Sequence, residues 1–263
     1  MITIRKYGDL VRYITIKRFL GRSLFNANSY SLEGCMFDTG INMGDELASV
    51  SPPISNIFIS HTHHDHVGNN ASIQKAYGST IYCHPGSVGK IRHPDNSSFI
   101  ECFFAGKVWP SVPLEYPDKI ELDGAKIVPL HTPGHSDDHS CYYLPERRYL
   151  FSGDLVLWGR TKWVSDEVNI YRAIESLEKI GKLDIDVLFP GHGRPFEDPP
   201  KIIEEKTEHL KELGVSVLEL NEKGLSRKEI RDRVLGKEES MAFLTRGRFS
   251  KLNLVDSYLD HKA

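Results

Sequence analysis

Cysteine is scarce in this chain of 263 residues, and no two cysteines form a CxxC pair. The four that occur are scattered along the sequence: Cys35, Cys83, Cys102 and Cys141. Disulfide frameworks belong to short, cysteine-rich secreted chains, so a disulfide-stabilised fold is excluded. We expect reduced, mostly buried thiols in a cytoplasmic protein, with a cysteine acting as metal ligand or nucleophile as the alternative.

Long hydrophobic runs and a charge imbalance are missing too. The sequence has no run of about 18 apolar residues, so we expect no membrane span. Residues 1–7 lack the charged head, apolar run and cleavage site of a signal peptide. The formal net charge of -3 gives no reason to expect binding of polyanions by the whole surface. No GxSxG motif occurs, so the usual sign of a serine hydrolase is absent.

Histidine is present in dense clusters. Directly after the apolar residues 54–59, four potential metal ligands stand within six positions: His61, His63, Asp65 and His66. Imidazole nitrogen and carboxylate oxygen are ligands of zinc-like ions. Without a metal they would be polar groups at the end of a core strand with little to satisfy them. The alternative, a polar surface turn, explains the density less well, and the stretch predicts a metal site.

The spacing within this stretch indicates two ions. His61 and His63 are two residues apart, so in an extended chain they point to the same side and can share one metal. Asp65 and His66 follow where the chain should turn into a helix, so their side chains point elsewhere. This predicts a second metal beside the first, and two ions about 3.5–4 Å apart are a known hydrolytic arrangement.

Further potential ligands follow strands at other places in the chain. An apolar strand, then a turn, then a ligand type recurs at Asp38, His135, Asp154 and His192. Each alone reads as a turn residue, but ligands gathered from strand ends along one sheet edge form a rigid site. Asp38 is interpreted as a residue that orients the metal loop, with a turn-capping Asp as the alternative. His84, which also ends a strand, is interpreted as a loop residue.

The remaining pattern predicts strands first and helices later. Alternating residues predict strands in residues 1–37, with a hairpin turn at Glu33-Gly34 and a second hairpin around Asp123-Gly124. Helical spacing is found in residues 70–77 and 167–180. Residues 86–118 lack clear periodicity and are interpreted as a lid or binding loop, or as a solvent-facing insertion.

These motifs together resemble the metallo-β-lactamase-fold hydrolases across residues 1–197. The resemblance implies an α/β fold, a four-layer αβ/βα sandwich of two mixed β-sheets packed face to face with helices outside. It also implies that His61, His63 and His135 hold one metal, that Asp65, His66 and His192 hold the second, and that Asp154 bridges both. A bridging Asp154 and the lack of a ligand Cys are similar to the glyoxalase II branch, although that branch's glutathione-binding C-terminal signature is not found.

The composition changes after residue 197, which divides the chain into a catalytic domain, residues 1–197, and a helical C-terminal appendage, residues 198–263. A helix is expected to residue 221, a second after the capping-box pattern Ser226 to Glu229, and a last one capped by Ser250. Residues 223–251 carry nine Lys or Arg against four Asp or Glu. Solvated helix faces explain this excess, and a basic surface for RNA is the alternative.

The predicted function is hydrolysis of a small ester or thioester by a dinuclear centre and its bridging hydroxide. Asp65 and Asp154 are expected to serve catalysis as well as ligation. The metals are two divalent ions, with zinc expected and iron or manganese possible for these ligands. The alternatives are a phosphodiesterase or ribonuclease, and a mono-iron sulfur dioxygenase using His61, His135 and Asp154. A small-molecule substrate is expected, and its identity and the oligomeric state are left open.

Overall fold

The computed structural model describes residues 1–19, 22–122 and 125–260. The chain forms two compact units. The first comprises residues 1–131, 138–157 and 186–197, and the second comprises residues 132–137, 158–185 and 198–263. The sequence-based boundary after residue 197 stays a prediction.

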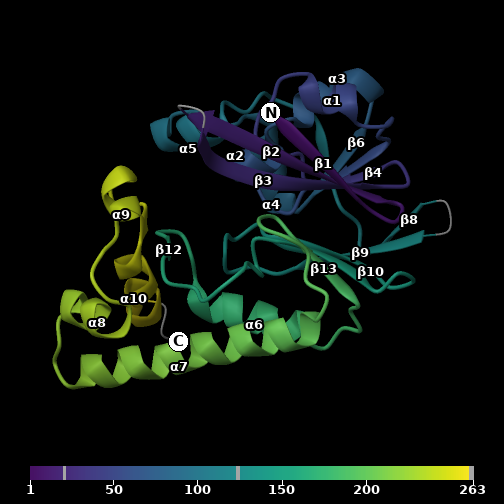
Figure 1. Cartoon of the computed structure of the whole chain (residues 1–263). Helices are drawn as coiled ribbons and strands as arrows, with labels where there is room; N and C mark the ends of the chain where they lie inside the picture. The colour runs from purple at the N-terminus through teal and green to yellow at the C-terminus, as the bar shows by residue number, and fades with distance from the viewer. Residues whose placement is uncertain (20–21, 123–124, 261–263) are drawn as a thin grey trace. The chain divides into compact units, whose positions relative to one another are not determined.

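The first unit contains a mixed seven-stranded sheet in the order β1 to β7 (Figure 1). Strands β1 to β4 pair antiparallel and β4 to β7 pair parallel. Glu33 and Gly34 both have positive φ, of 49° and 75°, as a tight hairpin turn requires, and the predicted turn is confirmed. The bounds are β1 (Ile2–Tyr7), β2 (Leu10–Phe19), β3 (Arg22–Leu32), β4 (Cys35–Phe37), β5 (Asn56–Phe58), β6 (Thr80–Cys83) and β7 (Pro113–Glu115).

A second mixed sheet of five strands has the order β13-β11-β10-β9-β8. Strand β13 pairs parallel with β11, and the other neighbours are antiparallel. The predicted turn at Asp123-Gly124 lies outside the described residues, although the strands that flank it are confirmed. The bounds are β8 (Ile120–Leu122), β9 (Ala125–His131), β10 (Ser140–Leu144), β11 (Tyr149–Gly153) and β13 (Val187–Pro190).

An aromatic core joins the two sheets. Phe37 and Phe58 of the first sheet pack with Tyr142, Phe151 and Phe189 of the second. The rings of Phe37 and Phe151 stack with centroids 3.6 Å apart. Fully burying an aromatic side chain of this size contributes about 1.5–3 kcal/mol. The predicted face-to-face packing of two mixed sheets is therefore confirmed within this unit.

The opposite face of the seven-stranded sheet carries helices. Alternation along the strands turns Met36, Ile57 and Ile81 to this face, where they join Leu47 of α1 and Ile73 of α3 in a second buried cluster. The helix predicted over residues 70–77 is confirmed and ends at Gly78 in the left-handed conformation. The helices of this unit are α1 (Glu46–Val50), α2 (His64–Val67), α3 (Asn70–Tyr77), α4 (Pro85–Arg92) and α5 (Phe99–Ala105).

Residues 86–118 are more regular than the sequence suggested. Helices α4 and α5 and strand β7 lie in this stretch, so the interpretation as a long irregular loop is wrong. Each helix spans about two turns, which is too short to show a periodic apolar face. Both begin at side-chain caps, because His84 accepts from Gly86 N and Ser98 accepts from Glu101 N. His84 therefore caps helix α4. It lies in the loop before that helix, which agrees with its interpretation as a loop residue.

The second unit is mainly helical (Figure 1). The predicted helices are confirmed, including the capping box of Ser226 and Glu229 and the cap that Ser250 Oγ makes on Asn253 N at 3.0 Å. Tyr258 donates from its hydroxyl to Leu210 O at 2.6 Å, which ties the last helix to the longest one. The elements are β12 (Val164–Ser165), α6 (Ile170–Ile180), α7 (Pro199–Glu222), α8 (Arg227–Val234), α9 (Ser240–Leu244), β14 (Phe249–Ser250) and α10 (Lys251–Asp260).

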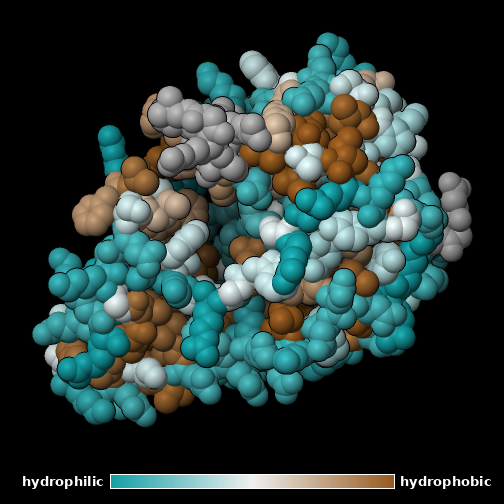
Figure 2. All heavy atoms as spheres, in the orientation of Figure 1, coloured by the Kyte–Doolittle hydropathy of each residue, from teal (hydrophilic) through white to brown (hydrophobic). Residues whose placement is uncertain are grey.

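The surface is largely hydrophilic on the face shown in Figure 2, with apolar side chains in separate groups. Among the described residues, no helix combines the length and the apolar composition needed to cross a membrane. The longest helix, α7, has 24 residues, but charged side chains recur along it.

Candidate metal centre

The predicted ligand loop lies between strand β5 and helix α2. His61 and His63 follow the strand, and α2 begins at His64, so Asp65 and His66 lie in the helix as predicted. Gly68 ends this helix against the backbone of residues 40–42, where any Cβ would overlap Asn42 N and Gly40 O. Glycine is therefore required at this position to let the helix approach.

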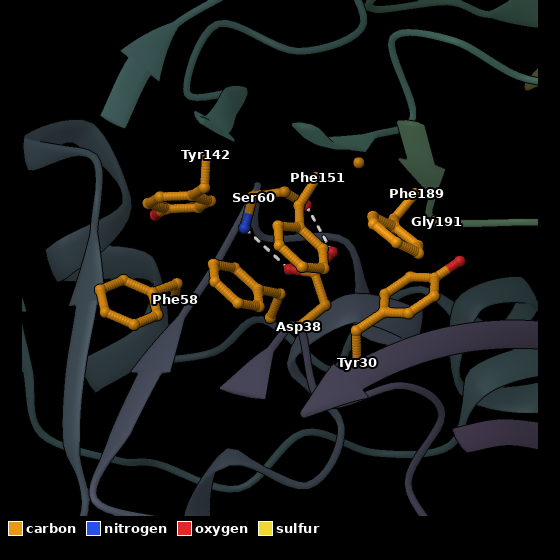
Figure 3. A pocket seen from close by; sticks show the side chains of 10 residues that line it. Tyr30, Asp38, Phe58, Ser60, Tyr142, Phe151, Phe189 and Gly191 are labelled. Carbon is orange, nitrogen blue, oxygen red and sulfur yellow. Dashed lines mark hydrogen bonds between the residues drawn. The ribbon is translucent and has the colours of Figure 1, made fainter. Parts of the chain in front are cut away.

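Asp38 connects the end of β4 to this loop. Its backbone has φ 54°, an uncommon conformation for a residue other than glycine. Its Oδ1 accepts from Ser60 N at 2.7 Å, and its Oδ2 accepts from Ser60 Oγ at 2.8 Å (Figure 3). The same Oδ2 lies 2.8 Å from Nδ1 of His66. One carboxylate thus holds both ends of the ligand loop, as its interpretation as an orienting residue requires.

Ser60 extends the reach of Asp38 to a second histidine. Its Oγ lies 2.9 Å from Nδ1 of His61. Because this hydroxyl donates to Asp38, it accepts from His61, which must carry its proton on Nδ1. His61 and His66 are thereby both oriented through Nδ1, leaving Nε2 as the potential ligand atom. The sequence reasoning missed Ser60, and the only signal was a hydroxyl residue directly before a ligand.

Asp154 follows strand β11 and faces two imidazoles. Its Oδ1 lies 3.4 Å from Nε2 of His66, and its Oδ2 lies 3.4 Å from Nε2 of His192. Its backbone N donates to Nε2 of His139 at 3.1 Å. His139 is fully buried and was also missed from the sequence, although it lies four residues after His135 in the same polar run. Positioning of Asp154 therefore involves a further histidine.

His192 reaches the same place from the loop after β13. Its Nδ1 donates to Asn26 O at 2.7 Å, and its Nε2 lies 3.1 Å from Oδ2 of Asp65. The residue before it is Gly191, where a Cβ would overlap Oδ1 of Asp154 and the ring of His66. The absence of a side chain at this position lets the loop approach the other ligands.

Within the first unit, the ligand atoms form two overlapping groups that share His66. His61, His66 and Asp154 form one group, and Asp65, His66 and His192 form the other, with the ligand atoms of each group within 4.8 Å of one another. Nε2 of His66 is buried and makes no hydrogen bond to any residue that the structure describes. A buried imidazole nitrogen without a hydrogen bond, close to two carboxylates, is an arrangement that fits a divalent ion.

Two predicted ligands, His63 and His135, lie outside the two groups that share His66. His63 directs its Nδ1 to Nε2 of His61, at 2.9 Å, so the two imidazoles predicted to share one metal do lie together. His135 lies in residues 132–137, which group with the second unit. Its role as a ligand stays a prediction from the sequence, as do the assignments of individual ligands to the two ions.

Burial and ion pairing act against each other on these side chains. Burial alone would raise the pKa of the Asp65 carboxyl, but the charges on His66 and His192 outweigh it and hold that pKa below its usual value. The same balance lowers the pKa of Asp154. Burial would lower the pKa of His192, yet Asp154 and Asp65 raise it to about 10, and they and Asp38 raise that of His66. The carboxylates therefore remain ionised and available as ligands.

A second buried carboxylate supports the ligand loop from the other side. Oδ2 of Asp138 accepts from Thr62 Oγ1 at 2.7 Å, and from Ser87 Oγ and Lys90 Nζ at 3.1 Å each. Thr62 is the residue between His61 and His63, so Asp138 restrains the peptide that carries both imidazoles. Sequence reasoning did not identify Asp138, because its partners come from two separate segments, the ligand loop and helix α4.

A family model described as the metallo-beta-lactamase superfamily matches residues 35–192 of this chain. The matched span runs from β4 to His192 and includes every residue predicted for the metal site. The chain belongs to the metallo-β-lactamase superfamily, whose members are generally hydrolases.

Curated relatives share about 30% identity with part of the chain. A beta-lactamase-like protein 2 homolog from Drosophila melanogaster is 30% identical over 185 residues, which cover 68% of this chain and 58% of that protein. An atrochrysone carboxyl ACP thioesterase from Emericella nidulans is 30% identical over 159 residues, or 60% of this chain and 45% of that protein. The chain thus spans about half the length of these relatives.

Solved structures share the fold at lower identity. A metallo-beta-lactamase family protein from Thermus thermophilus has a TM-score of 0.68 at 18% identity, covering 97% of this chain and 93% of its own. A beta-lactamase domain protein from Burkholderia ambifaria also has a TM-score of 0.68, at 16% identity, covering 98% of this chain and 84% of its own. The predicted metallo-β-lactamase fold is confirmed by these likenesses and by the family match.

Proposed function

We propose that this protein is a dinuclear metal-dependent hydrolase of a small ester or thioester, similar in its chemistry to the glyoxalase II branch. The observation that carries the proposal is the pair of adjacent ligand groups that share His66. Nε2 of His66 can bind only one ion, so His61 and Asp154 are left for a second ion, together with the predicted ligands His63 and His135. Thioesterase is also the activity named for a relative with 30% identity.

The residues that would hold the ions are His61, His63, His135, Asp65, His66, Asp154 and His192. When bound, two divalent ions lower the pKa of water toward about 7 and stabilise negative charge on a substrate oxygen. The chain's own residues provide the geometry. Asp38 and Ser60 fix the ring positions of His61 and His66, and His139 holds the backbone of Asp154. A thiolate leaving group needs little protonation, which suits a site without an evident general acid among its described residues.

The competing ribonuclease function has less support. Its sequence basis is the excess of Lys and Arg in residues 223–251. In the second unit Arg227 pairs with Asp256 and Asp260, and Arg231 pairs with Asp232 and Glu238. These two guanidinium groups are held by acidic neighbours, which weakens the basic surface that RNA would need.

The test is elemental analysis of protein purified without chelator, together with Asp154→Ala. We expect two equivalents of zinc, iron or manganese in the natural protein and a sharp loss in the variant, because both oxygens of Asp154 face the ligand groups. Asp118→Ala, at an exposed aspartate of the same unit, is the matched control and should keep both equivalents.

A substrate panel separates the activities. It contains short acyl esters and thioesters, a phosphodiester, an RNA oligonucleotide, and a persulfide with measurement of oxygen uptake. Turnover of esters or thioesters that falls with Asp154→Ala supports the proposal. One equivalent of iron with oxygen uptake on the persulfide, or cleavage of RNA alone, would contradict it.

A further inference from the structure

The loop that carries His192 is held by its backbone carbonyls. Asn28 of β3 donates from Nδ2 to Pro190 O at 2.9 Å and to Gly193 O at 3.0 Å, and from its backbone N to Gly191 O at 2.8 Å. Tyr30, two residues further along β3, donates from its hydroxyl to Pro190 O at 2.8 Å. Residues on both sides of His192 are therefore fixed by one strand.

A buried arginine completes this arrangement. Arg12 of β2 is paired in register with Tyr30, and only 6% of its surface is exposed. Its Nε donates to Oδ1 of Asn28 at 3.0 Å, and its Nη2 donates to Gly193 O. Because Nε is a donor only, the amide oxygen of Asn28 must face Arg12. The amide nitrogen then faces the loop, so Arg12 also decides the orientation of the asparagine.

Burying the polar side chains of Arg12 and Asn28 costs free energy of folding, so their presence here calls for a role beyond stability. A buried asparagine amide and a buried guanidinium lose their hydration, and apolar residues of similar volume often stabilise a core equally well. Here each of the hydrogen bonds described for the Asn28 side chain ends on Arg12, on Tyr30 or on the loop. The arrangement therefore specifies the position of the loop.

We propose that Arg12 and Asn28 are positioning residues that place the His192 imidazole and thereby control metal occupancy of the Asp65–His66–His192 group. The inference rests on the proposed dinuclear centre. His61 and Asp154, which belong only to the other group, are positioned by different residues, namely Ser60 and His139. Loss of the Arg12–Asn28 pair should therefore affect one ion and spare the other.

The discriminating variant is Asn28→Asp. It keeps the shape of the side chain and gains an ion pair with Arg12, so the fold has a reason to survive. It replaces the amide donor with an oxygen facing the carbonyls of Pro190 and Gly193, which repels the loop. In a zinc titration we expect the dissociation constant of one equivalent to rise about 10–100-fold, as is typical when a partner of a metal-binding histidine is lost. The other equivalent should bind as in the natural protein.

A matched control is available in the second unit. Asn253 donates from Nδ2 to Val164 O, Gly247 O and Arg248 O, at 3.2, 3.0 and 2.9 Å. Asn253→Asp therefore removes the same kind of bonds away from the ligand groups. It should lower the melting temperature of the metal-free protein about as much as Asn28→Asp, with no change in either zinc dissociation constant.

A second readout does not depend on metal. In metal-free protein the Nδ1–H of His192, bonded to Asn26 O, should give a slowly exchanging imidazole proton signal in nuclear magnetic resonance, assigned by its loss in His192→Asn. The signal should disappear or shift in Asn28→Asp and, more weakly, in Arg12→Lys, because a lysine lacks the fork that reaches both Asn28 and Gly193.

The outcomes separate the two proposals. Natural protein that binds fewer than two ions contradicts the proposed function, while the imidazole signal still tests the position of His192. An unchanged signal and unchanged zinc binding in Asn28→Asp would overturn the positioning role. Equal weakening of both equivalents would also overturn it, since the pair would then support the whole fold.

Discussion

Buried polar residues have different roles in the two units. In the first unit, Asp38 and Ser60 direct their hydrogen bonds to histidines whose Nε2 atoms face the ligand groups. In the second unit, the buried Lys251 donates to Leu235 O and Lys237 O at 3.0 Å and pairs with Glu239 at 2.8 Å, which closes the end of α8. The first set leaves Nε2 of His66 without a hydrogen bond to any described residue, whereas the second set pairs its donors with acceptors inside the same unit.

This difference separates function from stability. A polar network whose hydrogen bonds all join its own members stabilises only the fold. A network that also orients a potential metal-binding imidazole affects what that imidazole binds. Substitutions in the first unit should therefore change metal binding and stability together. Substitutions in residues 198–260 of the second unit should change stability alone.

The largest expected effect comes from Asp38→Ala. It leaves Ser60 and His66 without their shared acceptor, and breaking a buried charged network in this way costs about 3–5 kcal/mol. Metal affinity should fall about 10–100-fold as well. Urea denaturation of metal-free protein and zinc titration measure the two effects.

Asp256→Ala in the second unit is the counterpart. Asp256 pairs with an exposed Arg227, and such pairs contribute about 0.2–1 kcal/mol. Zinc binding should not change. Equal effects of the two aspartate variants on zinc affinity would remove the distinction between the units.

Metal affinity should depend strongly on pH. The pKa of His192 is raised to about 10 and that of His66 is also raised, so both rings are protonated at neutral pH in metal-free protein. Ligand imidazoles must be neutral, so an ion displaces these protons and binds more tightly as pH rises toward about 10. For each proton released, affinity should rise about tenfold per pH unit.

Isothermal titration in buffers of different ionisation enthalpy counts the protons released between pH 6 and 8. Asp65 and Asp154, whose pKa values are lowered, stay ionised over this range and should add nothing to the count. Zinc affinity independent of pH would contradict the ion pairing described for the site.

Lys251→Met tests the self-contained network of the second unit. The variant keeps most of the apolar stem but leaves two carbonyls and Glu239 without a donor, which costs about 1–3 kcal/mol. Thermal unfolding should show the loss, and zinc stoichiometry should stay the same. Reduced zinc stoichiometry would show that the two units are coupled.

A small effect is also expected for Ser226→Ala. It removes the capping box at the start of α8, worth about 1 kcal/mol. The melting temperature should fall slightly with no effect on metal binding. Ser226→Asp, which can still cap the helix, should restore the stability, and failure to do so would argue against a capping role.

Much of this protein could be predicted from local sequence. Strand alternation, the Glu33-Gly34 turn and the Ser226 capping box each depend on neighbours a few residues apart. The stretch from His61 to His66 likewise carries four potential ligands at a spacing that already indicates a metal. The local sequence is enough to predict such features, because the backbone fixes the relative directions of side chains that are a few residues apart.

Other features could not be read from the sequence for physical reasons. Helix α9 and the short pair of β12 with β14 have too few residues for a periodic signal. The helices within residues 86–118 begin at side-chain caps. Such a cap forms its hydrogen bond only when the backbone has already adopted the first helical turn. A prediction based on periodicity misses elements of this length.

The sequence by itself determined the ligand types, their order, and the strand ends that carry them. Only the tertiary structure decided which groups hold those ligands in place. These groups are separated from their hydrogen-bond partners by up to 181 residues or lie on separate segments. They are Ser60, His139, Asp138 and the pair of Arg12 and Asn28. A hydrogen bond needs its partners at about 3 Å with aligned donors, and no spacing in the chain encodes that when the two partners belong to different strands.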